Sequence, residues 1–140
     1  MTGLHKALNA FWSGFSHGGR KIPAYLSGRV PERNPATGEA WTDEALFPYI
    51  TYEALEGAAF GDNVLTAFVW LRKSATADAA RAQILDTIRA AIPCEGVRIA
   101  CEDGYMELFP NDSGFLSYYD DPEDGDVLGA RISYEIRFLM

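Results

Sequence analysis

The sequence predicts an α+β fold in which a mainly antiparallel, mixed sheet carries two helices packed on one face. Two segments have the periodicity of amphipathic helices, and several others have the periodicity or the composition of strands. The strands cluster along the chain instead of alternating regularly with helices, which argues against a doubly wound sheet. The 140 residues fit a single domain spanning residues 1–140.

The first helix is expected from about Gly3 to Phe15. Its apolar side chains recur every three or four residues, so they share one helical face. They are Leu4, Leu8, Phe11, Trp12 and Phe15. Gly18 and Gly19 are expected to end the helix. The apolar face is expected to pack on the protein's own sheet, with anchoring of a partner as the alternative.

A short edge strand or an extended segment is expected at Ile22–Leu26, where Pro23 limits its pairing. Residues 27–46 have no usable periodicity, and an irregular loop of that length is usually functional or disordered. Trp41 within this loop is a candidate interface anchor, because aromatic residues are enriched in interfaces. Residues 47–52 are rich in aromatic and β-branched side chains and predict a strand.

Residues 64–72 predict a central strand, because they are nearly all apolar. Val64, Thr66, Phe68 and Trp70 share one face of this strand, and Leu65, Ala67, Val69 and Leu71 share the other. A strand that is apolar on both faces is expected to be covered on both sides. The second cover could be another subunit.

The second helix is expected to begin near Ser74 or Thr76 and to end before Pro93. Its predicted buried face is Ala77, Ala80, Ile84, Ile88 and Ala91, with Leu85 and Ile92 beside it. Its predicted solvent side carries Arg81, Asp86 and Arg89.

Four further segments predict strands near the end of the chain. Gly96–Cys101 and Tyr105–Phe109 flank a hairpin turn at residues 102–104, and Phe115–Tyr119 predicts a short strand that could pair at an edge. Gly129–Leu139 alternates apolar and polar side chains in the pattern of a half-buried strand.

Composition and motifs weigh against several functions. A net charge of −8 and a pI of about 4.6 argue against binding nucleic-acid phosphates. No apolar run approaches the ~20 residues of a membrane span, and the first residues do not resemble a signal peptide. Cys94 and Cys101 are expected as free thiols, with a disulfide or reactive site as the lesser alternative. No nucleophile, nucleotide-binding or cofactor motif is present, so we expect no enzyme and no cofactor.

Neither the histidines nor the acidic run gives a convincing metal site. His5 and His17 lie in no ligand-like spacing. A calcium loop that starts at Asp120 would place Pro122 and Arg131 at positions that need oxygen ligands. Residues 120–126 are therefore expected as a solvated turn, with a weak cation site or an acidic patch facing a channel or a basic neighbour as alternatives.

A set of short motifs, taken in order, points to one family. Ala7-Leu8 and Phe11-Trp12 lie in the first helix, and Ile22–Leu26 leads to Gly28-Arg-Val-Pro31. Phe47-Pro-Tyr-Ile-Thr-Tyr52, a strand ending in Val69-Trp70, a helix and a final Tyr-bearing strand follow. This order resembles the small tail terminator, or tail-completion, proteins of siphophages, over essentially the whole chain.

The resemblance implies a structural virion protein at the head-tail junction, assembled in the host cytoplasm. Such proteins form a hexameric ring on the tail tube protein, stop tube polymerisation and present a surface to a head-side connector or stopper protein. DNA passes through the lumen without specific binding, and no membrane is involved. An acidic lumen would repel DNA.

The alternative with the same fold is another head-tail connector or minor tail subunit, and a ligand-binding module would need a closed pocket that the sequence does not indicate. The expected assembly interface lies in loops 27–46 and 111–127 and the adjoining strand. Its candidate residues are Trp41, Phe47, Tyr49, Asp120, Asp121, Glu123 and Asp124.

Overall fold

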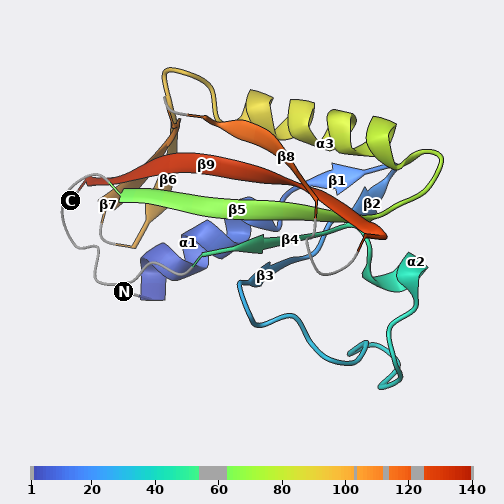
Figure 1. Cartoon of the computed structure of the whole chain (residues 1–140). Coiled ribbons are helices and arrows are strands. Elements are labelled where there is room, and N and C mark those ends of the chain that lie inside the picture. Colours follow the sequence, from blue (N-terminus) through green and yellow to red (C-terminus); the bar gives the residue numbers. More distant parts are fainter. Residues whose placement is uncertain (1, 54–62, 103, 112–113, 121–124, 140) are drawn as a thin grey trace.

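The computed structural model describes residues 2–53, 63–102, 104–111, 114–120 and 125–139 (Figure 1). The helices are α1 (Thr2–Trp12), α2 (Asp43–Leu46) and α3 (Ala77–Ala91). The strands are β1 (Ser16–His17), β2 (Arg20–Lys21), β3 (Ala24–Leu26), β4 (Tyr49–Tyr52), β5 (Asn63–Arg72), β6 (Val97–Cys101), β7 (Gly104–Pro110), β8 (Leu116–Asp120) and β9 (Val127–Leu139). The predicted α+β class is confirmed.

Seven strands form one curled sheet in the order β3-β4-β5-β9-β7-β6, and β8 pairs with β9 beside β7. Every pairing in this sheet is antiparallel except β3 with β4, so the sheet is mixed as predicted. The long β9 holds the sheet together, because β5 pairs along one edge while β7 and β8 share the other. β1 and β2 form a separate two-stranded hairpin.

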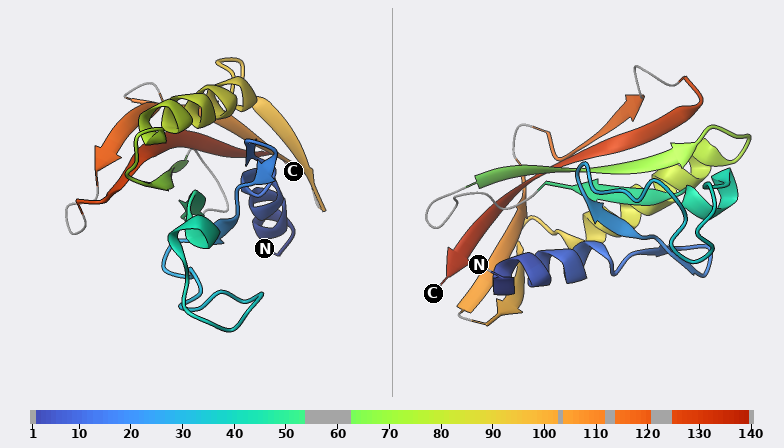
Figure 2. Two further views of the ribbon diagram at one scale, coloured as in Figure 1. Left: turned by 90° about the vertical axis from the view of Figure 1, so that its right-hand side faces the viewer. Right: turned by 90° about the horizontal axis from the view of Figure 1, so that it is seen from below.

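The helices α1 and α3 lie on the same side of the sheet, as Figure 2 shows in its view from below. From α1, the buried Trp12 donates its indole N–H to the hydroxyl of Tyr134 on β9, at 3.2 Å. From α3, Ile84 and Ile88 are buried against the same side. The apolar row that β5 turns toward the helices is buried as well. This covered face supplies the hydrophobic core.

The end of the first helix and the role of the glycines that follow it differ from the prediction. The helix ends at Trp12 rather than Phe15, and Gly18-Gly19 do not end it. Both glycines have positive φ, 61° and 78°, and form the two-residue turn between β1 and β2. Two consecutive positive φ values are the geometry of the tight hairpin turn that glycine adopts without strain.

Arg81 corrects the expected solvent side of α3. The residue is only 8% exposed, and its guanidinium donates to the backbone oxygen of Gly129 at 3.1 Å and to Asp78 at 3.0 Å. It also lies 3.9 Å from the ring centre of Tyr118. The spacing Ala77, Arg81, Ile84, Ile88 places Arg81 on the buried stripe, so helical periodicity already contained this signal. Asp86 and Arg89 are exposed, as expected.

The 27–46 segment is held by its own polar contacts. An isolated bridge joins Arg33 to Ala40, and the backbone oxygen of Asn34 accepts from the N–H of Gly38 at 2.7 Å. Arg20 ties the end of the segment to β2 by donating to the carbonyl oxygens of Glu44 and Ala45.

Candidate assembly interface

The side of the sheet opposite α1 and α3, called the open face from here on, carries an aromatic surface. The strand register aligns two rows across it. One row is Tyr49, Trp70, Gly129 and Tyr119, and the next is Tyr25, Thr51, Phe68, Arg131 and Ser117. Residues from five strands therefore meet on one surface, although they are spread from position 25 to position 131.

Phe68, Trp70 and Tyr119 form the aromatic cluster at the centre of the open face. Phe68 and Trp70 are stacked with ring centroids 5.3 Å apart, and Tyr119 meets both rings edge-on at 5.2 and 5.7 Å. The indole N–H of Trp70 donates to the Thr51 hydroxyl at 3.0 Å, which orients the ring. All three rings remain half-buried. A half-buried, oriented aromatic cluster has the composition of an interface core.

Gly129 of β9 lies between Trp70 on β5 and Tyr119 on β8, and its lack of a side chain leaves room for the two rings. A Cβ built there would lie 2.4 Å from the backbone oxygen of Val69 and 3.3 Å from the Trp70 ring. Trp70 and Tyr119 flank the glycine on the neighbouring strands and cover its bare backbone. The close approach of the strands therefore requires glycine at this position.

Three arginines lie on the open face, and one of them, Arg131, is paired with Phe68 of the aromatic cluster in the strand register. Arg98, Arg131 and Arg137 are exposed, and the strand register places them on the open face. Arg98 and Arg137 pair with Glu107 and Glu135 of the same face at 3.6 and 3.8 Å. No carboxylate among the described residues pairs with Arg131. Two of the three arginines on this face are therefore balanced by glutamates of the same face.

The structure brings together some of the interface residues expected from the sequence. Tyr49 lies on the open face, between Tyr25 at 6.4 Å and Phe47 at 5.4 Å between ring centroids. Asp120 follows Tyr119 at the end of β8, but it points to the helical side and lies 3.8 Å from Arg81. Asp121, Glu123 and Asp124 lie outside the described residues.

Trp41 is used within its own segment. Its indole N–H donates to the carbonyl oxygen of Pro31 at 2.7 Å, and its side chain is half-buried. Within the described chain, no ring contact connects it to the aromatic cluster. The prediction of Trp41 as an interface anchor stays a prediction.

The cluster itself was absent from the expected interface residues. One signal for it was available, because the apolar second face of residues 64–72 already indicated a cover. Tyr119 could not be found in this way, since its place beside Trp70 depends on the pairing of β8 with β9.

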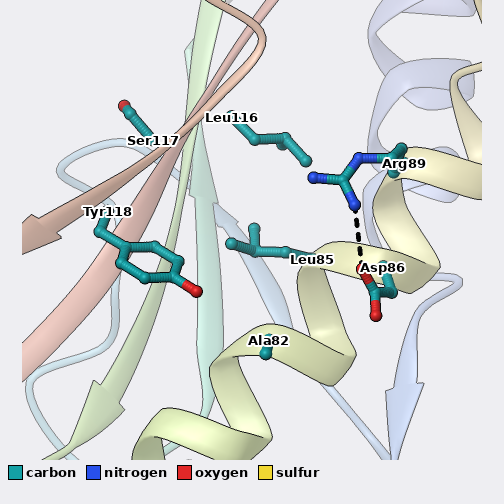
Figure 3. Close-up of a pocket in the computed structure, with 7 residues that line it drawn as sticks. All are labelled: Ala82, Leu85, Asp86, Arg89, Leu116, Ser117 and Tyr118. Carbon is teal, nitrogen blue, oxygen red and sulfur yellow. Dashed lines mark hydrogen bonds and ion pairs between the residues drawn. The ribbon is translucent and has the colours of Figure 1, made fainter.

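A second surface feature lies on the helical side, between α3 and β8 (Figure 3). It is an open groove of about 420 Å³ lined by Ala82, Leu85, Asp86, Arg89, Leu116, Ser117 and Tyr118. Arg89 and Asp86, drawn with a dashed line, form an ion pair at 3.0 Å on its rim. Leu85 and Leu116 contribute apolar side chains to a lining that is otherwise largely polar, and Tyr118 is 64% exposed.

In the described ranges, no group of three His, Cys, Asp or Glu side chains could hold a metal ion. Cys94 is exposed and Cys101 half-buried, both as free thiols, and burial raises the pKa of the Cys101 thiol. Burial also raises the pKa of the Tyr134 hydroxyl well above its ordinary value. That hydroxyl already accepts the Trp12 hydrogen bond in the core.

None of the helices in the described part of the chain has both the length and the apolar character required to cross a bilayer.

Comparisons with known proteins support the fold only. No family model matches the sequence, and no curated protein matches it. One solved structure aligns over 99% of this chain and 92% of its own chain, with a TM-score of 0.53 and 12% sequence identity. At that identity the likeness shows that the arrangement of helices and strands occurs in another protein.

Proposed function

We propose that this chain is a subunit of the ring that caps the tail tube of a long-tailed phage, ends tube polymerisation and joins the tail to a head-side connector. The open face carries this proposal. It presents an oriented, half-buried aromatic cluster on the side of the sheet away from α1 and α3. Such a surface suits contact with another protein better than contact with water.

The resemblance of the sequence to siphophage tail terminator proteins suggests which proteins the subunit contacts: other copies of itself, the tail tube protein and a head-side connector. A ring is built from head-to-tail contacts that close by symmetry, so each subunit needs two different surfaces. The open face and the helical side of this fold provide two such surfaces. Net negative charge elsewhere on the chain suits a ring through which DNA slides without binding.

Electron microscopy of tails assembled with and without the protein tests the proposal. We expect tubes longer than normal without it and tubes of normal length when the wild-type chain is supplied. Phe68→Asp, which places a charge in the aromatic cluster, should fail to restore tube length. Glu102→Gln changes an exposed charge in the turn that follows β6, so it should restore tube length and serves as the matched control. Normal, head-joined tails in the complete absence of the protein would refute the proposal.

The second candidate is another head-tail connector or minor tail subunit with the same fold. In this candidate the open face is still an assembly surface, but the proteins that contact it are different. Tubes of normal length that fail to join heads, together with density for the chain away from the tube end in a virion reconstruction, would favour this candidate.

A further inference from the structure

We infer that β8 detaches from the edge of β9 as one unit while the rest of the sheet stays folded, and that Arg81 is the residue that holds β8 in place. Detachment removes Tyr119 from the aromatic cluster, so only a subunit with β8 attached presents the complete cluster. Arg81 thereby controls the open face from the opposite side of the sheet. Contacts within one subunit carry this inference, whichever protein covers the open face.

β8 is attached to the sheet along one edge only. Among the described strands it pairs with β9 alone, opposite residues 128–132. β9 does not need this pairing to stay in the sheet, because β5 pairs with residues 127–136 of β9 and β7 pairs with residues 134–139. Loss of β8 therefore leaves the other strands of the sheet connected.

Neighbouring side chains of β8 contact opposite faces of the sheet. Figure 3 shows Tyr118 directed toward α3, where the centre of its ring lies 3.9 Å from the guanidinium carbon of Arg81. The next residue, Tyr119, meets the rings of Phe68 and Trp70 on the open face. A displacement of β8 therefore breaks contacts on both faces at the same time.

Little of β8 is buried. Ser117, Tyr118 and Asp120 are exposed, and Leu116 and Tyr119 are half-buried. The centre of β5, in contrast, carries fully buried side chains. Segments with few buried contacts open at a lower free energy than the core strands of the same protein. β8 is therefore expected to detach long before the whole chain unfolds.

Arg81 joins α3 to both β8 and β9. Besides its contact with Tyr118, its guanidinium lies 3.8 Å from the carboxylate of Asp120 and donates to the backbone oxygen of Gly129 at 3.1 Å. Because Arg81 is buried, these interactions are less weakened by water than those of a surface arginine. Its Nε, however, is buried without a hydrogen-bond partner among the described residues. A buried donor without an acceptor destabilises the attached arrangement, so Arg81 leaves detachment within reach.

Native-state hydrogen exchange, resolved to single amides at increasing low urea concentrations, tests the detachment. In the wild type, the β8 amides that bond to β9 should exchange at least about tenfold faster than amides at the centre of β5, with a weaker dependence on urea. Both rates are corrected for the intrinsic exchange rate of each amide. The same rate and the same urea dependence in β8 and β5 would overturn the inference, because β8 would then open only when the whole chain unfolds.

Substitutions test the role of Arg81. Arg81→Met removes the charged contacts to β8 and β9, so the β8 amides should exchange at least about tenfold faster than in the wild type. If Arg81→Met does not fold, Tyr118→Ala removes one of the same contacts at an exposed residue and should speed up β8 exchange about threefold. Arg89→Met removes an exposed ion pair of the same helix and should leave β8 exchange unchanged.

Tyr134→Phe distinguishes detachment of β8 from a general loss of stability. This substitution removes the hydrogen bond from Trp12 in the core, on the part of β9 that pairs with β7. It should speed up exchange at the centre of β5 and leave β8 exchange unchanged. Faster β8 exchange in Tyr134→Phe, or unchanged β8 exchange in Arg81→Met, would overturn the inference. Tail length in the absence of the protein decides the proposed function separately.

Discussion

Trp12 and Trp70 lie on opposite faces of the same sheet, and each donates its indole N–H to a side-chain hydroxyl. Trp12 is completely buried between α1 and β9, against Phe15 and Tyr134. Trp70 is half-buried, and the rings around it belong to the sheet itself. The covered face therefore holds the fold together, while the open face keeps aromatic area that the folded subunit does not fully bury. Substitutions on the two faces should separate stability from assembly.

Removing Trp12 should have the largest effect on stability. Trp12→Ala deletes a fully buried ring and leaves a cavity beside Tyr134, so the free energy of unfolding should fall by about 3–5 kcal/mol. Urea denaturation followed by circular dichroism measures this change. A loss below about 1 kcal/mol would mean that the covered face is not the main source of stability.

A substitution of Arg81 tests how much the edge of the covered face, where α3 meets β8, contributes to stability. Arg81→Met keeps much of the side-chain volume but removes the hydrogen bond to Gly129 and the contact above Tyr118. Leaving a buried carbonyl without its charged donor should lower the free energy of unfolding by about 2–3 kcal/mol. Arg89→Met removes only an exposed pair and should change it by less than about 0.5 kcal/mol. Equal effects of the two substitutions would contradict the burial of Arg81.

Tyr134 should make the stability of the covered face depend on pH. Tyr134→Phe leaves the buried indole N–H of Trp12 without its acceptor, so we expect a loss of about 1–2 kcal/mol at neutral pH. In the wild type, burial raises the pKa of Tyr134, so its phenol keeps its proton in the folded chain where an unfolded tyrosine ionises. The stability that the protonated Tyr134 phenol contributes is fully present below pH about 10 and is lost as the pH rises further.

Urea denaturation at neutral and strongly alkaline pH measures the difference. The wild type should lose more stability at alkaline pH than Tyr134→Phe does. Tyr105→Phe, at a tyrosine that is 47% exposed, should behave like the wild type. If Tyr134→Phe kept the full alkaline loss, another group would be responsible for it.

Local patterns in the sequence predicted the longer helices and strands, but they did not predict the β1–β2 hairpin or α2, and they predicted the surfaces less well. The periodicity of residues 64–72 predicted both faces of β5, and the alternation of residues 129–139 predicted β9. The aromatic cluster needed long-range information, because Phe68, Trp70 and Tyr119 meet only through the pairing of β9 with two other strands. Arg81 was misassigned for a different reason. Its charge favoured solvent, whereas its position on the buried stripe and its partners in the fold outweighed that preference.

Trp70 is the matched counterpart of Trp12 and should have a much smaller effect on stability than Trp12. Trp70→Ala removes a half-buried ring and its stacking on Phe68, so the free energy of unfolding should fall by only about 1 kcal/mol. Its effect on assembly should be larger, because buried tryptophans at the centre of an interface commonly contribute about 2 kcal/mol or more to binding. Sedimentation velocity and urea denaturation of the same sample measure both quantities. Trp70→Ala should thus remain folded while it loses self-association, whereas Trp12→Ala should unfold at lower urea. If Trp70→Ala cost as much stability as Trp12→Ala, the open face would be a second core of the subunit instead of a surface reserved for a neighbour.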